Sequence, residues 1–500
     1  MFADYVRYPA RAALMAAMLG VGQFVQAADA KAKPAVKPDA NGLEVVTLTI
    51  HPQKLPTPAL KYHLLPTFLQ QTPGNAVPLY AKAFIGVGDT LRNLARSDKP
   101  KSDCDLVDKW LLETPPKDIP RDRAKNLVEA FGMYQVEKAV RRERCDWDPP
   151  LRQGRMFEIL LPDVQESRYF ASMFALKARL CIAEGRYADA IEALQGGYSL
   201  ARQFAGYRLL VAGLYAEAQV DRMNVQLLTL CQQPGAPNLY WSLTELPHPL
   251  VGLEGCLATE YDGLYLQWPE LQKVRHAAYA PQQWDLVLRR FVSEVVRYDH
   301  RQSSQQEQKA EAAKIVARAL DNFARAKADL AAAGYAANQL DTMPPAQIVM
   351  LHTVERYDRQ RDEWFKWMHL PYWEAEKGIE AAEREIAGTR KHTQKEEIIP
   401  VGSWPMHALR NAKLVFARNE RELAAFRCIE ALRLYLADHD AKLPASLDEI
   451  REVPIPLNPM TGKPFPYHLK GATAVLEADG GPTSGPMGRR QTQYRITVAK

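Results

Sequence analysis

Hydrophobic side chains recur at helical spacing over most of the chain. From about residue 60 to residue 440, apolar positions return every three or four residues, as on the buried face of an amphipathic helix. The clearest predicted helices cover residues 77–93, 168–184, 187–204, 207–232 and 283–298. The pattern predicts a mainly α fold, in which a multi-helical domain is built from αα-hairpins.

Two of the predicted helices are long. Residues 302–333 carry apolar side chains at mostly helical spacings, which predicts one continuous helix with one buried face. These side chains are Ile315, Val316, Ala319, Leu320, Phe323 and Leu330. The second long helix begins near Met406 and runs to Leu436.

Strands are predicted only near the two ends of the chain. The segment LEVVTLTIHP alternates apolar and polar side chains, and we expect one edge strand there. After Asp440 the pattern changes to a short helix, a proline-rich turn and three small strands. We therefore expect a small C-terminal α+β module beside the helical domain.

The predicted organisation has four parts. Residues 1–30 are expected to be a signal peptide, and residues 31–57 a linker rich in Pro and Lys that contains the edge strand. Residues 58–400 form the predicted helical domain. Residues 401–500 combine the second long helix with the small β module.

The first thirty residues are typical of a secretory signal peptide. Arg7 and Arg11 supply a positively charged start, and an uncharged apolar run of ten residues follows. That run is too short to span a bilayer, which needs about 20 residues. Small residues then permit cleavage after Ala27 or Ala30. We expect an exported protein, periplasmic or extracellular, with no transmembrane anchor after cleavage; a buried helix of a cytosolic protein is the alternative.

Composition excludes several classes of protein. Of the 500 residues, 47% are hydrophobic and 25% are charged, which is ordinary for a folded, water-soluble chain. The net charge of +5 is spread without a basic tract, so we expect no nucleic-acid partner. The metalloprotease, P-loop, nucleophile-elbow and EF-hand motifs are absent, and the histidines are scattered. We expect no cofactor and no metal.

The six cysteines divide by their surroundings. Cys181, Cys231 and Cys428 lie inside helical apolar patterns, where a thiol packs as a small hydrophobic group. Cys104 and Cys145 lie in polar, turn-rich segments instead. Because export permits disulfides, a bridge between Cys104 and Cys145 is the pairing that we favour.

One segment resembles a tetratricopeptide helix–turn–helix. The match rests on its small and aromatic positions, namely Phe174, Ala178, Gly185, Tyr187, Ala190, Ile191 and Leu194. No second copy follows at the repeat spacing of about 34 residues, and a solenoid needs about three repeats. We therefore expect a single tetratricopeptide-like hairpin at about residues 171–204, inside a larger helical domain.

The C-terminal part resembles the C-terminal domain of type II secretion pseudopilins. A helix ending in ALRLYLADHDAKLPASLDEI precedes PLNPMTGKPFPYHL, in which Pro459, Gly462, Pro464 and Tyr467 match the family's turn. The resemblance covers about residues 420–480 and implies a small α+β module. Because the transmembrane stem of that family is absent, it does not imply assembly into a pilus.

A second resemblance covers about residues 58–480. The phrases ALKYHLLPTFLQQTPGNAVPLY, RRERCDWDPPLR and QPGAPNLYWSLTELPHPL look like an uncharacterised exported helical family that recurs in planctomycete genomes. This resemblance supports the helical domain and implies no activity.

An aromatic and acidic cluster is the main candidate for catalysis. Glycosidases use aromatic rings to stack on sugars and two carboxyl groups as acid and base. The candidate catalytic residues are Asp362, Glu363, Glu374 and Glu376, and the candidate sugar platform is Trp364, Trp367 and Trp373. Packing between helices explains the same pattern, and we favour that interpretation because aromatic rings dominate helical cores.

Two further clusters have similar alternatives. RRERCDWDPPLR offers Asp146 and Asp148 as an acid/base pair beside arginines, but we favour a salt-bridged turn held by Trp147. In APNLYWSLTELPHP, Tyr240 and Trp241 are candidate binding residues, and a short capped helix between prolines explains them equally well.

These patterns together favour a function without catalysis. We expect a structural or protein-interaction protein of the periplasm or cell envelope, with an envelope protein as its partner. The first alternative is an (α/α)-barrel-like glycoside hydrolase or lyase acting on polysaccharide. The second alternative is a protein that binds a small hydrophobic ligand in a helical cavity.

The signal peptide gives a direct prediction. When the full-length chain is exported by a bacterial host, the mature protein should begin at Ala28 or Lys31, as measured by intact mass. Replacing both Ala27 and Ala30 with a bulky residue should leave the precursor uncut, since cleavage needs small residues there. A mature chain that still carries Met1 would contradict the prediction.

Overall fold

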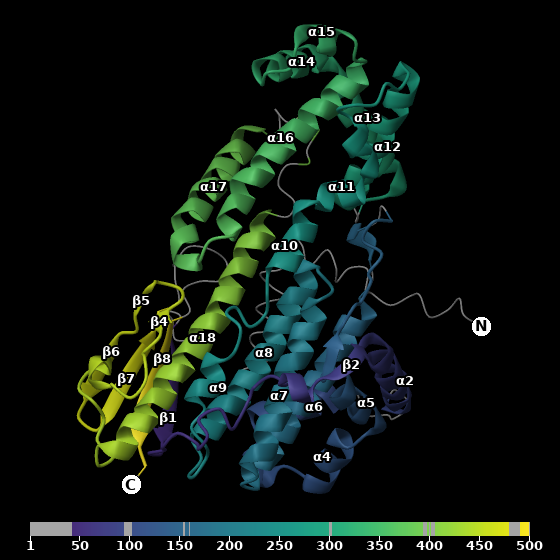
Figure 1. Ribbon diagram of the computed structural model, residues 1–500. Helices are drawn as coiled ribbons and strands as arrows, with labels where there is room; N and C mark the ends of the chain where they lie inside the picture. Colours follow the sequence, from purple (N-terminus) through teal and green to yellow (C-terminus); the bar gives the residue numbers. More distant parts are fainter. Residues whose placement is uncertain are drawn as a thin grey trace.

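The computed structural model describes residues 43–94, 103–153, 156–159, 161–299, 303–393, 398–399, 401, 406–479 and 491–499. The predicted signal peptide lies outside these residues. Within them the chain is mainly α, with a small sheet region formed largely by C-terminal residues (Figure 1). The predicted fold class is confirmed.

The helices form a lower body, an outer lobe and three long connections between them (Figure 1). The lower body contains α2 (Val77–Leu94), α3 (Asp103–Leu112), α4 (Arg121–Val128), α5 (Phe131–Ala139), α6 (Pro162–Ala183), α7 (Tyr187–Ala205), α8 (Leu210–Cys231), α9 (Tyr240–Thr244) and α10 (Glu254–Tyr261). The outer lobe contains α11 (Gly263–Gln267), α12 (Pro281–Asp299), α13 (Gln305–Asp321), α14 (Phe323–Ala332) and α15 (Ala337–Asp341). The connections are α16 (Pro345–Met368), α17 (Tyr372–Thr393) and α18 (Met406–Asp438). Short 3-10 turns are η1 (Phe68–Gln70), η2 (Pro116–Asp118), η3 (Met156–Glu158), η4 (Pro269–Lys273) and η5 (Leu447–Glu449).

The tetratricopeptide-like segment folds as an αα-hairpin. Helices α6 and α7 pack along each other and turn at Gly185, whose φ of +71° is a left-handed conformation that glycine adopts without strain. At Gly196 of α7 an added Cβ would lie only 2.4 Å from the ring of Phe174 on α6. Because Gly196 has no side chain, the two helices can approach closely at this point. Helix α8 packs against both of them.

One predicted helix is instead two. Residues 302–333 break between α13 and α14 at Asn322, whose backbone leaves the helical region at φ −91° and ψ 13°. The Asn322 side-chain amide donates to the carbonyl oxygen of Arg318 at 2.8 Å, a local bond that competes with helix continuation. Both Ile315 and Leu330 remain buried, because the break lets each helix pack against α16.

A four-stranded sheet brings together the two ends of the described chain. Its strand order is β1-β8-β7-β6, with β1 (Leu43–Ile50), β6 (Tyr467–Lys470), β7 (Thr473–Ala478) and β8 (Gln491–Val498). The predicted edge strand β1 pairs in parallel with β8 over all its residues, and β6, β7 and β8 pair antiparallel. Two smaller sheets pair β2 (Thr72–Asn75) with β3 (Arg142–Arg144), and β4 (Leu457–Asn458) with β5 (Lys463–Pro464).

The buried apolar side chains form two large clusters. The first runs from Leu48 in β1 through the lower body and α18 to Ile496 in β8. The second fills the outer lobe around Trp284. The predicted boundary at residue 401 has no counterpart in this packing, because α18 shares the first cluster with the helices that precede it.

Helix α18 lies between the helical body and the sheet (Figure 1). It packs against α8, α9, α17 and β7. A helix covered on most sides is usually apolar all round, yet α18 buries several polar side chains. They are Arg418, Asn419, Arg421, Glu422, Glu430 and Arg433. Because buried polar groups need partners, their hydrogen bonds decide which segments can surround the helix.

Two of these side chains form a fully buried ion pair. Arg433 Nη1 donates to both carboxylate oxygens of Glu430 at 2.9 Å, and neither side chain is exposed. Arg433 also donates to the carbonyl oxygens of Ala236 at 2.7 Å and His51 at 3.3 Å. Cys231 Sγ donates to Glu430 at 2.8 Å. One pair thus holds α18, the end of α8, the loop before α9 and the chain after β1.

Breaking this pair should destabilise the protein strongly. In Arg433→Met, the Glu430 carboxylate stays buried without its counter-charge, and the free energy of unfolding should fall by about 3–5 kcal/mol. Chemical denaturation measures the change. The double variant Glu430→Gln with Arg433→Met should recover part of the loss, because it removes the uncompensated charge.

A matched control uses an exposed pair. Arg289 and Asp285 form an ion pair on the surface of α12, so Arg289→Met should change stability by less than about 1 kcal/mol. Equal effects of Arg433→Met and Arg289→Met would contradict the structural role of the buried pair.

Candidate functional site

The three candidate sugar-stacking tryptophans lie in different surroundings. Trp364 is fully buried in the first core cluster, so a sugar ring cannot stack on it in this structure. Trp367 is partly buried and packs where Gly378 lets α17 approach α16. Trp373 is 42% exposed and lies against Gly462 in the turn between β4 and β5. For Trp364 and Trp367 the structure favours packing between helices.

The four candidate catalytic carboxylates are also in different surroundings. Asp362 is exposed and takes part in a polar network described below. Glu363 pairs with Lys366 on the surface of α16, and Glu374 is exposed on α17. Glu376 is partly buried, and its burial raises the pKa of its carboxyl group. Their catalytic role stays a prediction.

Tyr240 and Trp241 belong to the short helix α9. Tyr240 is fully buried, and its hydroxyl donates to the carbonyl oxygen of Pro454. The ring of Trp241 meets that of Tyr240 edge to face at 5.2 Å. The Asn238 side-chain oxygen accepts the N–H of Tyr240 at 3.0 Å, just before the helix begins. These contacts show a short helix that is packed into the core through Tyr240.

The segment around Cys145 packs through its tryptophan. Trp147 stacks on Tyr207 at 4.5 Å, and its indole N–H donates to the carbonyl oxygen of Gln203 at 2.8 Å. Cys145 is a free thiol in the structure, and burial raises its pKa to about 12. The side chain of Cys104 lies outside the described residues, so the bridge between the two stays a prediction.

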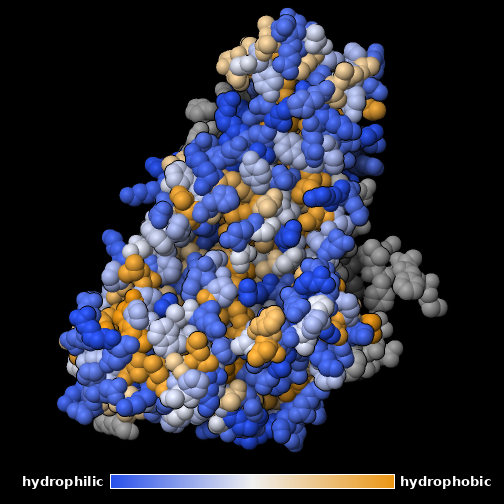
Figure 2. Space-filling view, viewed as in Figure 1, coloured by the Kyte–Doolittle hydropathy of each residue, from blue (hydrophilic) through white to orange (hydrophobic). Residues whose placement is uncertain are grey.

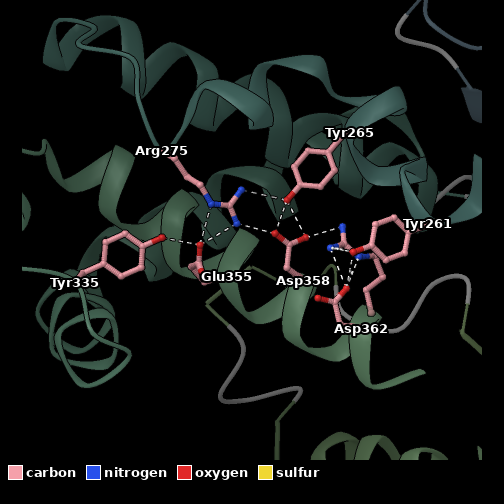
Figure 3. A network of polar contacts seen from close by, with 8 residues as sticks. Tyr261, Tyr265, Arg275, Tyr335, Glu355, Asp358 and Asp362 are labelled. Atoms are coloured by element: carbon pink, nitrogen blue, oxygen red, sulfur yellow. Dashed lines mark hydrogen bonds and ion pairs between the residues drawn. The ribbon is translucent and has the colours of Figure 1, made fainter. Parts of the chain in front are cut away.

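A polar network joins α16 to the outer lobe (Figure 3). Arg275 donates to Glu355 at 3.0 Å and to Asp358 at 2.6 Å. The hydroxyl of Tyr265 donates to Asp358 at 2.7 Å, and that of Tyr335 donates to Glu355 at 2.6 Å. The network thereby ties α11, the segment after η4 and the connection between α14 and α15 to one face of α16.

A second arginine extends the same network along α16. Arg361 is nearly buried and pairs with Asp358 at 2.8 Å and Asp362 at 3.0 Å. Its guanidinium lies 3.8 Å from the centre of the Tyr261 ring, and the Tyr261 hydroxyl donates to Asp362 at 2.9 Å. Since these charged groups and hydroxyls already bond to one another, we assign the network a structural role.

An open cavity on the αα-hairpin is a better candidate for binding. Its volume is about 510 Å³, and it lies between α5, α6, α7 and the start of β3. We call it the α7 cavity. Residues from each wall include Tyr134 and Lys138 of α5, Arg142 of β3, Phe174 of α6, and Glu192 and Gln195 of α7.

The crossing segment, residues 51–71 between β1 and β2, passes over α7 (Figure 1), and its Pro66 lines the α7 cavity. Gln195 of α7 fixes its path. The Gln195 amide lies within hydrogen-bond distance of the carbonyl oxygens of His63 at 3.1 Å and Leu65 at 3.0 Å, and of Gln70 Oε1 at 3.3 Å. Leu64 between them is fully buried. The crossing segment is therefore anchored on α7 beside the cavity that Pro66 lines.

Large apolar side chains are exposed beside this cavity. Phe68 and Leu69 in η1 are 81% and 93% exposed, and Tyr134 in the cavity wall is 52% exposed. In a 3-10 turn successive side chains point in different directions, so anchoring Gln70 toward Gln195 leaves Phe68 and Leu69 facing water. Grouped exposed apolar residues typically mark interaction sites.

Hydrophobic residues also reach the surface elsewhere. Figure 2 shows them mainly in the lower half of the view, including the region of the C-terminal sheet. There Leu457 and Leu469 are exposed.

A second cavity, of about 580 Å³, opens where the crossing segment meets the start of α7. Lys61 and Tyr62 line it from the crossing segment, and Arg186 and Asp189 line it from the hairpin turn and the first turn of α7. The two cavities have residues of the same helix face in their walls, because Ala188, Glu192 and Gln195 follow helical spacing.

Sequence analysis found only part of this site. It identified the hairpin and the basic cluster that contains Arg142, but not Phe68 and Leu69. The signal for these two was their position in PTFLQQ, a polar turn without helical or strand periodicity, where an apolar pair has no core to join. The neighbourhood of Lys138 and Arg142 could be seen only in the folded chain.

No known protein family, curated protein or solved structure matches the chain. None of the helices that the structure describes combines the length and apolar composition required to cross a bilayer. Among the same residues, no group of three or more His, Cys, Asp or Glu side chains is placed to hold a metal ion.

Burial shifts the pKa of carboxyl groups that lie outside these cavities. Glu217 of α8 and Glu260 of α10 are almost completely buried, and burial raises the pKa of both, that of Glu260 to about 7. Glu217 accepts a hydrogen bond from Asn419 of α18, and Glu260 accepts the backbone N–H of Leu210 at 3.2 Å. Shifted pKa values mark candidate functional groups, but both lie within helix packing.

The Glu260 carboxyl group should make stability depend on pH. Its pKa is raised in the folded state from the ordinary 4.5, so the folded protein binds a proton that the unfolded chain has lost between about pH 4.5 and 7. This group's stabilisation is therefore present at low pH and declines as pH rises to about 7. Between pH 5 and pH 8 it should lower the free energy of unfolding by roughly 2–3 kcal/mol.

Denaturant titrations of Glu260→Gln test this. The variant keeps an acceptor for the N–H of Leu210 but has no proton to lose, so its stability should decline less over the same pH range. Glu129→Gln, a change at an exposed position, should retain the wild-type pH dependence. An unchanged pH dependence in Glu260→Gln would disprove the assignment.

Proposed function

We propose that this protein is an exported, non-catalytic interaction protein of the periplasm or cell envelope, and that it binds a partner protein at the α7 cavity. The amino-terminal pattern of charged, apolar and small residues supports export. The single observation that supports the binding role most strongly is the exposure of Phe68 and Leu69, in the turn between Pro66 and Thr72. Both Pro66 and Thr72 line the α7 cavity, as does the exposed Tyr134.

The physical reason is the cost of exposing apolar surface. Burying a side chain of the size of Leu or Phe gains about 1.5–3 kcal/mol. Phe68 and Leu69 forgo that gain, although Leu64 of the same segment is buried in the core. A partner that covers them would recover it, and the anchored crossing segment would not have to rearrange first.

The alternatives receive less support. A glycosidase groove needs exposed aromatic platforms, and Trp364 is buried while Trp367 packs between helices. A carrier of small hydrophobic ligands needs a pocket that encloses most of the ligand, whereas the α7 cavity and the second cavity are open and have charged side chains in their walls. A surface for a protein partner accommodates apolar and charged groups together.

Site-specific photo-crosslinking in the native cells tests the proposal. A photoreactive amino acid is introduced at Leu69 and, separately, at Tyr134, and the crosslinked proteins are identified by mass spectrometry. Both positions should capture the same protein from the envelope fraction, since Tyr134 lines the α7 cavity and Leu69 lies in the turn between its lining residues Pro66 and Thr72. The control is Leu286, which is 57% exposed on α12 in the outer lobe.

The variant Phe68→Ser with Leu69→Ser should reduce the yield of the Tyr134 crosslink about tenfold or more, because it removes two exposed apolar contacts. Its thermal unfolding should match that of the wild-type protein, because neither side chain is buried. The proposal fails if Leu286 captures the same proteins as Leu69, or if neither cavity position captures a protein.

A further inference from the structure

The charged groups of the α7 cavity are not balanced. Two of its basic side chains have acidic partners within the cavity. Arg141, the residue before β3, donates to Glu192 of α7, and Lys177 of α6 donates to Glu137 of α5. These pairs neutralise four charges in the walls, which leaves the other basic residues to determine the sign of the cavity.

Two basic side chains of the cavity have no carboxylate partner among the described residues. Lys138 is exposed, and its ammonium group lies 4.2 Å from the centre of the Tyr134 ring. The guanidinium of Arg142 donates to the carbonyl oxygen of Pro73, and its Nε is buried without a hydrogen-bond partner. Both residues line the cavity, so it carries two uncompensated positive charges.

The second cavity on α7 adds to this positive potential. Its lining includes Lys61, which lies over the ring of Tyr62 at 5.5 Å and has no carboxylate partner among the described residues. Arg186 in the same cavity is already bonded to Glu184 and Asp189. Ala188 lines the second cavity and Glu192 lines the α7 cavity, and the two residues are one helical turn apart on α7. The positive charge of Lys61 is therefore added on the same face of α7 as the α7 cavity.

We infer that the partner enters the α7 cavity with an acidic peptide segment whose carboxylates face Lys138 and Arg142 and whose apolar side chains cover Phe68, Leu69 and Tyr134. The inference rests on the proposed function and specifies the chemistry of the partner. Charge complementarity is the argument for the acidic groups, since an exposed cation and a guanidinium without acidic partners attract carboxylates.

The exposed apolar side chains of Phe68 and Leu69 favour a peptide over a simple polyanion as the ligand. A nucleic acid or a phosphate chain could neutralise Lys138 and Arg142 but would leave Phe68 and Leu69 in water. A peptide that alternates acidic and apolar side chains satisfies both. In an extended strand successive side chains point to opposite sides, which lets one face carry the carboxylates and the other the apolar groups.

Fluorescence anisotropy tests the inference on the full mature protein. The probe is a fluorescein-labelled peptide that alternates Glu and Leu, and the matched probe has Gln in place of every Glu. The Glu peptide should bind about tenfold more tightly than the Gln peptide at low salt, and the difference should shrink as salt screens the charges.

Charge reversal at Lys138 tests whether this lysine attracts the carboxylates of the peptide. Lys138→Glu should weaken binding of the Glu peptide about fivefold or more and leave binding of the Gln peptide nearly unchanged. The matched control is Lys470→Glu on β6, an exposed lysine far along the chain from this cavity, which should change neither affinity. Both variants should unfold at the wild-type temperature, because both side chains are exposed.

The outcomes separate the inference from the proposed function. Equal affinity for the two peptides, or an affinity that Lys138→Glu does not change, overturns the acidic-segment inference; the proposed function then stands if Leu69 and Tyr134 still crosslink one protein. Binding of a short single-stranded DNA as tightly as the Glu peptide also overturns the inference. Preference for the Glu peptide that is lost in Lys138→Glu supports it when Leu69 and Tyr134 also crosslink one protein; failure of both crosslinks overturns the proposed function and with it the inference.

Discussion

The buried ion pair between Glu430 and Arg433 is the constraint on which the arrangement of the chain depends. Charges without water cost several kcal/mol unless they are paired and hydrogen-bonded. Here the pair is satisfied only when Cys231, Ala236 and the chain after β1 surround it. Segments that are about two hundred to four hundred residues apart in sequence are thereby required in one place, and an apolar contact alone would not specify them so narrowly.

The contact between α8 and α18 also depends on buried polar side chains that bond to each other. Asn419 of α18 donates to the backbone oxygen of Glu217 at 3.0 Å, and Asn224 of α8 donates to Glu422 at 3.0 Å. Tyr198 of α7 donates to Asn224 at 2.8 Å and brings the hairpin into the same network. The helical body and the C-terminal module are therefore one packed unit, because α18 has partners on both sides.

This rigid body explains why the α7 cavity can be a binding surface. One side of α7 packs in the core, while Gln195 near the cavity anchors the crossing segment. The segment is consequently held with Phe68 and Leu69 outward, and the basic groups of α5 and β3 are held beside them. A surface that is already ordered loses little conformational entropy on binding, which favours a recognition role.

Local patterns in the sequence by themselves determined the class of fold, the αα-hairpin, the edge strand and the long helix α18, because helical and strand periodicity act over a few residues. They did not predict the break at Asn322, where a side-chain bond to the backbone competes with an otherwise helical pattern. The pairing of β1 with β8 and the meeting of Lys138 and Arg142 in the wall of one cavity became visible only in the folded chain. The physical reason is that strand pairing and the lining of a cavity depend on contacts between segments far apart in the sequence, and such contacts produce no periodic pattern of apolar residues.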